Sequence, residues 1–247
     1  MKSLLKMTWI EAKLFLREPV GAFFTLIFPL MMLFLFGSIY GNKPTHYFGG
    51  RGTVDISVPA YTAMIIATTS LVGLTITMAA YREQGVLRRL RTTPISPLVV
   101  LAAQVIVLFM MTAIGMLLLV VAGRLVYQMR FDGNAISVIV GFILCCISFF
   151  ALGFVLAGLM PTARAAQVVG MVLLYPMLFL SGAGFPRELL PETILKISKF
   201  LPLTYVVTLL RGLWIGDPWS QHLTEVFVLL GMLVLGVIIS VKTFRWE

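Results

Sequence analysis

Charge is scarce in this sequence, and in six long stretches it is almost absent. Only 12% of the 247 residues are Asp, Glu, Lys or Arg, while 60% are hydrophobic. A water-soluble domain of this size does not have such a composition. About 20 apolar residues in a helix cross the hydrocarbon core of a bilayer. The sequence therefore predicts an all-α membrane protein with six transmembrane helices, at Val20–Tyr40, Val58–Ala80, Leu98–Ala122, Ile136–Met160, Ala166–Phe185 and Leu223–Val241.

The lack of charge inside these stretches limits how the protein can work. None of them contains Asp, Glu, Lys, Arg or His, except for Glu225 at the start of the last one. Pumps and carriers that run on ions or protons usually place such groups at membrane depth, although each costs about 2.5–3.5 kcal/mol there. If the protein moves a solute uphill, we expect the energy to come from a partner.

Catalytic and metal-binding groups are equally scarce. The two histidines, His46 and His222, are far apart, and Cys145 and Cys146 are neighbours inside the fourth stretch. Neighbouring cysteines rarely form a disulfide, and a metal site needs more ligands than this. No Gly-Lys pair occurs in the sequence, so it has no phosphate-binding loop. We predict no catalytic residue, no metal and no cofactor in this chain.

The distribution of Lys and Arg predicts the orientation in the membrane. With the N-terminus in the cytoplasm, the segments 1–19, 81–97, 161–165 and 242–247 hold 11 of the 19. The two short loops on the other side hold two each. Basic residues favour the cytoplasmic side, so we expect a multi-pass protein of a cell membrane with both termini in the cytoplasm. The net charge of +9 then reflects topology and contact with lipids, and no nucleic-acid partner is expected.

Residues 1–19 predict a helix that lies in the membrane interface. Four basic residues share one narrow stripe of this helix: Lys2, Lys6, Lys13 and Arg17. Apolar residues cover most of the remaining surface, and Pro19 turns the chain into the bilayer. Glu11 and Glu18 form a second, acidic stripe. They are interpreted either as solvated carboxylates or as a docking point for a basic partner surface.

Residues 82–92 combine arginines with apolar side chains in a loop expected to face the cytoplasm. Val86, Leu87 and Leu90 can share one side of a short helix, which the prolines at 94 and 97 end. An orienting loop needs arginines but no apolar residues aimed at water. An apolar patch rimmed by charge indicates a contact with another protein.

The second span is rich in hydroxyl groups, which include those of Thr68, Thr69 and Thr75. Such hydroxyls usually donate to carbonyls of their own helix, so a purely structural role is one interpretation. The alternative is that this span lines a path through the membrane, because no other span carries as many.

Residues 186–215 predict helices too short to cross a bilayer. Prolines at 186, 191 and 202 divide this region into short apolar pieces, and Pro218 follows it. They are typical of a re-entrant or outer-leaflet helical hairpin, which is tolerated where protein covers its broken backbone. An alternative count makes Leu201–Ile215 a distorted span.

Together, three segments identify the chain as similar to the permease subunit of ABC-2 type transporters, of the small bacterial drug- or antibiotic-exporter kind. The resemblance covers nearly the full length. It rests on the helix Trp9–Pro19, on the loop REQGVLRRLRTTPIS at 82–96, and on the stretch Ser181-Gly182 … Phe185-Pro186 … Leu190-Pro191 … Phe200-Leu201-Pro202-Leu203-Thr204-Tyr205 … Leu210-Arg211-Gly212.

This resemblance implies a single transmembrane domain over 1–247, which pairs with a second permease and with two cytoplasmic ATPase chains that bind ATP and Mg²⁺. Residues 82–92 would be the coupling helix. The residues implied in ATPase coupling are Glu83, Gly85, Val86, Leu87, Arg88, Arg89 and Leu90, with Glu11 and Glu18. The implied translocation path joins Thr68, Thr69 and Thr75 to Tyr175, Met177 and Phe179 of the fifth span. Aromatic and Met side chains suit an apolar or amphipathic cargo such as a drug, antibiotic or lipid.

Other classes of function fit less well. A stand-alone secondary carrier or channel is the main alternative, but it is expected to show intramembrane acids or an internal repeat. A membrane enzyme needs converging polar groups, and the sequence offers none. A membrane assembly scaffold remains a third possibility.

Overall fold

A computed structural model of the chain describes residues 2–86 and 97–243. It confirms the predicted fold class, because six helical runs are long and apolar enough to cross a membrane. These runs are α2 (Pro19–Ala22), η1 (Phe23–Ile27) and α3 (Phe28–Tyr40); α4 (Thr53–Thr68), η3 (Thr69–Leu74) and α5 (Thr75–Glu83); α7 (Pro97–Tyr127); α8 (Ala135–Leu159); α9 (Ala163–Ser181); and α12 (Leu223–Thr243).

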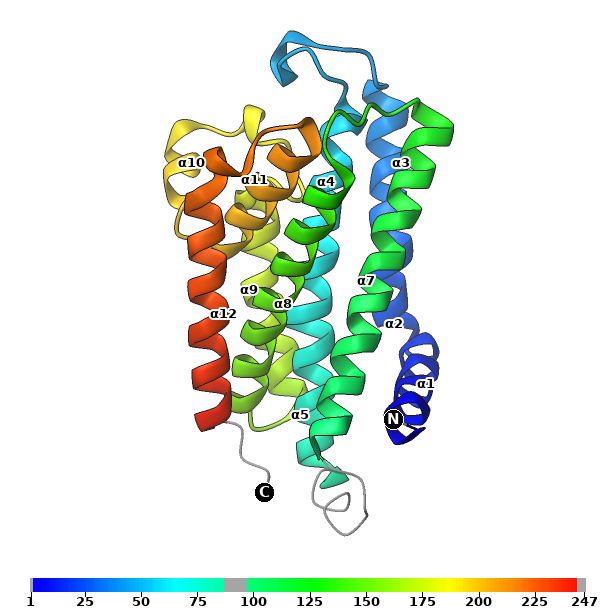
Figure 1. Cartoon of the computed structure of the whole chain (residues 1–247), viewed down its shortest axis with the longest axis vertical. Helices are drawn as coiled ribbons and strands as arrows, with labels where there is room; N and C mark the ends of the chain where they lie inside the picture. The colour runs from blue at the N-terminus through cyan, green and yellow to red at the C-terminus, as the bar shows by residue number, and fades with distance from the viewer. Residues whose placement is uncertain (1, 87–96, 244–247) are drawn as a thin grey trace.

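The six runs lie alongside one another as a bundle (Figure 1). The N-terminal helix α1 (Lys2–Arg17) and the C-terminal end of α12 lie at the same end of the bundle, which we call the α1 end. The short helices α10 (Glu192–Ser198) and α11 (Pro202–Ile215) lie at the opposite end, which we call the α11 end. The even number of crossings in the described residues therefore returns the chain to the side where it began.

Helix α1 has the amphipathic character expected of an interfacial helix. It packs against α7 and leaves apolar side chains exposed: Leu5, Trp9, Ile10, Leu14 and Leu16. The ammonium group of Lys13 lies 5.1 Å from the centre of the Trp9 ring, within the range of a cation–π contact. Pro19 then begins α2, where its missing N–H leaves no unsatisfied donor. The exposed apolar face suits the boundary between headgroups and acyl chains.

The second span begins at Thr53, earlier than the predicted Val58, because a buried carboxylate satisfies the start of the helix. Asp55 is 1% exposed. One of its oxygens accepts from Asn42 Nδ2 at 2.9 Å and from the Arg130 N–H at 2.8 Å, and the other accepts from the Gly52 N–H at 3.0 Å. A carboxylate in the first helical turn is also favoured by the helix dipole. Residues 53–57, which precede the predicted start of span two, are therefore helical.

Two spans contain π-helical turns, which the sequence analysis did not predict. One is η1, and the other, η3, lies in the middle of span two. A Cβ atom on Gly153 of α8 would lie 2.7 Å from the carbonyl oxygen of Ser70, and one on Gly170 of α9 would overlap the carbonyl oxygen of Leu71. Glycines at these two positions therefore let α8 and α9 approach the backbone of η3. Short π-helical turns often mark functional sites.

The predicted helical hairpin at 186–215 is present, and its second helix is part of the core. The axes of α10 and α11 are bent by 101° at their junction. Side chains of α11 satisfy carbonyls at this break: Thr204 Oγ1 donates to Ser198 O at 2.6 Å, and Tyr205 OH donates to Lys199 O at 2.8 Å. Irregular backbone is tolerated in a membrane where protein supplies such partners.

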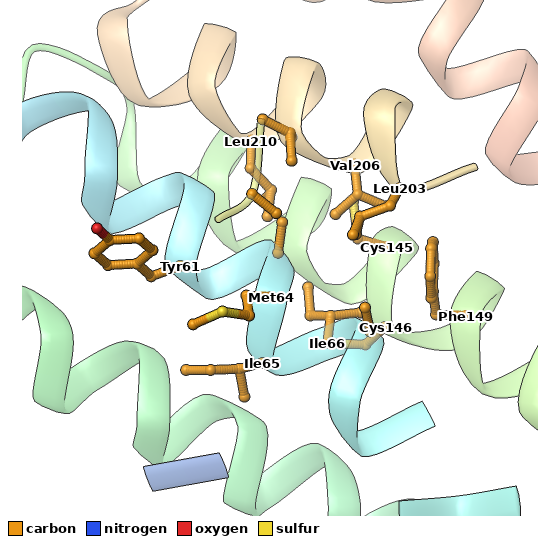
Figure 2. Packing of buried hydrophobic residues seen from close by; sticks show 14 of the residues in the cluster. Tyr61, Met64, Ile65, Ile66, Cys145, Cys146, Phe149, Leu203, Val206 and Leu210 are labelled. Atoms are coloured by element: carbon orange, nitrogen blue, oxygen red, sulfur yellow. The ribbon is translucent and has the colours of Figure 1, made fainter. Parts of the chain in front are cut away.

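Helix α11 packs against α4, α8, α9 and α12. Figure 2 shows Leu203, Val206 and Leu210 of α11 facing side chains from α4 and α8, which include Cys145 and Cys146. Both cysteines are free and buried, in agreement with the expectation that these neighbours form no disulfide. Helix α11 therefore occupies the interior of the α11 end.

Candidate functional site

The α1 end contains a buried contact between α1 and span two. The hydroxyl of Tyr81, near the end of α5, lies 2.8 Å from each carboxylate oxygen of Glu11. Glu11 is 3% exposed, and this burial raises the pKa of its carboxyl, while the bond from Tyr81 lowers it to a smaller extent. Glu11 therefore joins α1 to span two inside the chain, and its carboxylate does not face the surface.

Glu18 is placed differently from Glu11. It stands between α1 and α2, is exposed, and its carboxyl group lies over Gly21. Of the two carboxylates predicted to contact an ATPase, Glu18 is the one that a partner can reach directly. The sequence pattern places Glu11 and Glu18 on one stripe and does not reveal the role of Tyr81. The available signal is a tyrosine at the end of a span, where its hydroxyl can donate to a carboxylate.

Arg82 and Glu83 bind the connection between spans four and five. The Arg82 guanidinium donates to the carbonyl of Gly158 at 2.9 Å and to that of Met160, which end α8. Glu83 Oε2 accepts from the Ala163 N–H at 2.8 Å, at the start of α9. Carbonyls that end a helix and N–H groups that begin one lack partners within the helix. Arg82 thus caps the C-terminal end of α8, and Glu83 caps the N-terminal end of α9.

Residues 82 and 83 are the last two residues of α5, so the predicted coupling helix 82–92 does not begin at 82 as a separate helix. Gly85 follows with φ +64°, a left-handed conformation that ends helices and favours glycine. Val86 is half-buried. Leu87, Arg88, Arg89 and Leu90 lie outside the described residues.

The predicted path hydroxyls of span two bond to groups within the chain. Thr69 is 1% exposed, and its hydroxyl donates to Ile65 O at 2.8 Å and lies 3.2 Å from the Thr112 hydroxyl of α7. Thr75 is fully buried and donates to Ser70 O at 3.1 Å. Thr68 is half-buried and donates to Met64 O at 2.9 Å. Each of these three hydroxyls thus donates to a carbonyl of its own span, and of the three only Thr68 is also partly exposed.

Helix α9 presents a stripe of exposed apolar residues. Val168, Val172, Tyr175 and Phe179 are 57%, 64%, 47% and 61% exposed, at a spacing typical of one helix face. Met177, the third predicted path residue of this span, is instead buried at 8% exposure. Helix α9 packs against η3 and α5, so this stripe lies on the neighbour of span two. Tyr175, Phe179 and Thr68 are the predicted path residues that face outward.

Residues 2–214 match the family described as ABC-2 type transporter. The chain is 26% identical over 239 residues to a putative transport permease, ycf38, from Porphyra purpurea, with 92% of this chain and 79% of that protein aligned. It is 32% identical over 99 residues to nodulation protein J from Rhizobium leguminosarum bv. viciae, with 40% and 38% aligned. It is 21% identical over 160 residues to a probable multidrug ABC transporter permease, YbhR, from Escherichia coli K12, with 65% and 44% aligned.

The chain belongs to the ABC-2 type transporter family, as the sequence resemblance predicted. It spans less than half the length of nodulation protein J and of YbhR, and about four-fifths of ycf38. Members of this family are membrane subunits of ABC exporters, and they generally work with cytoplasmic ATPase subunits. The six apolar helices agree with a multi-pass membrane protein.

Proposed function

We propose that the chain is the permease subunit of an ATP-driven exporter and that two permeases form the path for an apolar or amphipathic cargo. One observation carries this proposal: the described residues form a six-helix bundle of the ABC-2 family, and the sequence has neither a phosphate-binding loop nor the intramembrane charge expected of an ion-driven carrier. ATP and Mg²⁺ are then bound by two separate ATPase subunits, and this chain has no catalytic residue.

The contacts at the α1 end support a route for coupling. Just before the predicted coupling segment, Arg82 and Glu83 bind the α8–α9 connection, and Tyr81 binds α1. A push on this segment by a closing ATPase therefore reaches spans two, four and five and helix α1 together. Alternating access then consists of rigid-body movement of one permease against the other.

The exposed stripe on α9 supports the position of the path. Its apolar and aromatic residues provide a surface that suits a second permease or an apolar cargo. We place the path along Tyr175, Phe179 and the open side of Thr68, between this chain and a second copy or a paralogue.

The test is purification of the tagged chain from its native membrane in mild detergent, followed by mass spectrometry. We expect a soluble chain with a phosphate-binding loop in equal amount. The variant Leu87→Asp/Arg88→Glu, changed in the predicted coupling segment, is expected to insert into the membrane normally but to purify without the ATPase chain. The matched control is Lys196→Glu/Ile197→Asp on α10, which is expected to retain it. A homo-oligomer with no ATPase, under conditions that preserve other complexes, would support a stand-alone carrier or channel.

We also propose that the α1 end faces the cytoplasm of a bacterial cell, with both termini inside, on the basis of the Lys and Arg bias. Single cysteines in a Cys145→Ala/Cys146→Ala background measure this orientation. A membrane-impermeant maleimide is expected to label Ser220→Cys in intact cells and Lys6→Cys only after the membrane is opened. Labelling in the reverse order would overturn the orientation.

A further inference from the structure

A cavity whose lining includes several charged and polar side chains lies at the α11 end, opposite the coupling contacts of the α1 end. It has a volume of about 210 Å³. Its walls come from the 3₁₀ turn η4 (Arg187–Leu189), from α11, and from the turn that leads into η5 (Trp219–His222). The lining residues are Arg187, Val207, Thr208, Arg211, Gly212, Ile215, Asp217 and His222.

The two arginines of this cavity have different partners. Arg211 forms an ion pair with Glu188. Arg187 donates to the Thr208 hydroxyl at 2.7 Å, and within the described parts of the chain it forms no ion pair. Burial lowers the pKa of Arg187, and the neighbouring charge of Arg211 lowers it further, while the carboxylates of Glu188 and Glu225 partly offset this. A half-buried guanidinium with no carboxylate in ion-pair contact is stabilised by an anion bound beside it.

His222 is a buried imidazole that stands between two carboxylates at the cavity wall. It is 7% exposed, and neither of its ring nitrogens makes a hydrogen bond within the described parts of the chain. The nearest carboxylates are Asp217 Oδ2, 3.5 Å from Nε2, and Glu225 Oε2, 3.8 Å from Nδ1. Buried polar groups are normally satisfied, so the lack of a hydrogen bond between His222 and Asp217 leaves the Asp217 carboxylate open to a cationic group in the cavity.

Two glycines make room for these side chains. A Cβ atom on Gly212 would overlap the imidazole of His222, and one on Gly182 would overlap the side-chain stem of Arg187. Gly182 also has φ +90°, a left-handed conformation that ends α9 at Ser181. The fifth span therefore ends before Phe185, the predicted end of Ala166–Phe185. Both glycines belong to the sequence stretch that carried the family resemblance, and the cavity gives them a physical purpose.

The charges of the cavity are ordered along α11. Arg187 is held at the level of Thr208, whereas His222 lies against Gly212, and Asp217 donates its N–H to the carbonyl of Gly212. Gly212 comes four positions after Thr208 in α11, which corresponds to a rise of about 6 Å along the helix axis. A group with a negative charge at one end and a positive charge at the other, about one helical turn apart, would match this order.

We propose that this cavity binds a phosphoethanolamine group, with the phosphate ester on Arg187 and the ammonium on Asp217. The group can come from the headgroup of a lipid or from a soluble phosphate ester. The phosphate lies against the Arg187 guanidinium, which forms no ion pair among the described residues, and the ammonium lies against the Asp217 carboxylate beside His222. This binding site does not depend on the proposed transport function.

The experiment measures the thermal stability of the delipidated full chain in a neutral detergent, by tryptophan fluorescence. Four probes are titrated: dihexanoyl phosphatidylethanolamine, dihexanoyl phosphatidylglycerol, free phosphorylethanolamine and inorganic phosphate. We expect saturable stabilisation with the first lipid, and weaker stabilisation with the second. A response to phosphorylethanolamine equal to that of the first lipid assigns the site to a soluble ester, and a response confined to the lipid assigns it to a headgroup.

Variants test the two ends of the site separately. Arg187→Gln is expected to weaken the response at least tenfold, whereas Lys196→Gln, which removes an exposed cation of α10, leaves it unchanged. Asp217→Asn is expected to remove the preference for ethanolamine over glycerol. If Arg187→Gln does not fold, Thr208→Val removes the bond that orients Arg187 at nearly constant volume and is expected to weaken binding. An unchanged response in Arg187→Gln or Thr208→Val, or an equal loss in Lys196→Gln, would overturn the site.

Discussion

The hydroxyl of Tyr81 lies 2.8 Å from both carboxylate oxygens of Glu11, a residue seventy positions earlier in the chain. This contact joins the N-terminal helix to the last full turn of span two, directly before the segment expected to meet an ATPase. It places a carboxylate in a buried position with one side-chain donor. The stability of the α1 end should therefore depend on that donor and on pH.

We expect Tyr81→Phe to lower the free energy of unfolding by about 1–3 kcal/mol at neutral pH, because Glu11 loses its side-chain donor. Burial raises the Glu11 pKa above its ordinary value of 4.5, so the folded chain binds this proton more tightly than the unfolded chain. The resulting stabilisation is present below pH 4.5 and is lost as the pH rises through the raised pKa.

Without Tyr81 that pKa rises further, so the loss of stability with rising pH should continue to a higher pH in Tyr81→Phe than in the wild-type chain. Thermal unfolding in detergent at several pH values measures this pH dependence. Glu11→Gln is the control, since it has no carboxyl to titrate and should lack this pH dependence. The same pH dependence in Tyr81→Phe and in the wild-type chain would contradict the prediction.

The close approach of α9 to η3 should make Gly170 sensitive to substitution. In Gly170→Ala the new methyl group meets the carbonyl oxygen of Leu71, which belongs to the backbone and cannot move aside cheaply. We expect a loss of about 1–3 kcal/mol. In the control Gly231→Ala nothing lies within 4 Å of the new methyl group, so this variant should be neutral or gain up to about 1 kcal/mol. Similar unfolding temperatures for the two variants would show that the helices can separate without cost.

Arg82 and Glu83 should hold the connection between α8 and α9 in place. We expect Arg82→Ala and Glu83→Ala each to destabilise this connection locally by about 1 kcal/mol, by loss of bonds to helix ends. Hydrogen exchange of peptides that cover 158–166 should then be about fivefold faster, while exchange elsewhere is unchanged. Arg164→Ala, which changes an exposed cation of the same region, is the control. Uniformly faster exchange in all three variants would argue against the caps.

The translocation path can be tested with residues that face outward. In a transport assay, Phe179→Ala and Tyr175→Ala are expected to alter the rate or range of export without reducing the amount of folded chain. The control Phe227→Ala removes another exposed aromatic side chain, on α12, and should leave export unchanged. If export tolerates both α9 changes, the path lies elsewhere.

Thr69→Trp distinguishes a path residue from a core residue. Thr69 is 1% exposed and lies against Thr112, so an indole there overpacks the contact between spans two and three. We expect a loss of at least about 3 kcal/mol and little folded chain. A stable Thr69→Trp protein that fails to export would instead support the path along the hydroxyls of span two.

Much of the architecture could be predicted from the sequence because the bilayer restricts the choices. A stretch of about 20 apolar residues without charge can only be a spanning helix, so all six spans were predicted. Their ends were less accurate: Asp55 extends span two at its start, and Gly182 ends span five early. Both ends depend on contacts with residues far away in the sequence or on one backbone angle.

The sites were predicted less fully than the spans. The sequence places Glu11 and Glu18 on one stripe of a helix, but only the fold decides that Tyr81 covers one of them. It shows that span two is rich in hydroxyls, but not that Thr69 and Thr75 face α7 and α8. Helical periodicity gives the spacing of side chains around an axis, and it does not say which neighbour each face meets.

The sequence by itself determined that this protein is a six-span membrane protein with a basic interfacial helix and a helical hairpin before the last span, because hydrophobic length, charge and proline are local properties that the bilayer selects directly. Tertiary structure alone decided that Arg82 caps the end of α8 and Glu83 the start of α9, that α11 fills the core of the α11 end, and that Arg187, Asp217 and His222 line one cavity. Each of these depends on which helices are neighbours, and in a bundle the neighbours are chosen by close packing and by the partners available to buried polar groups.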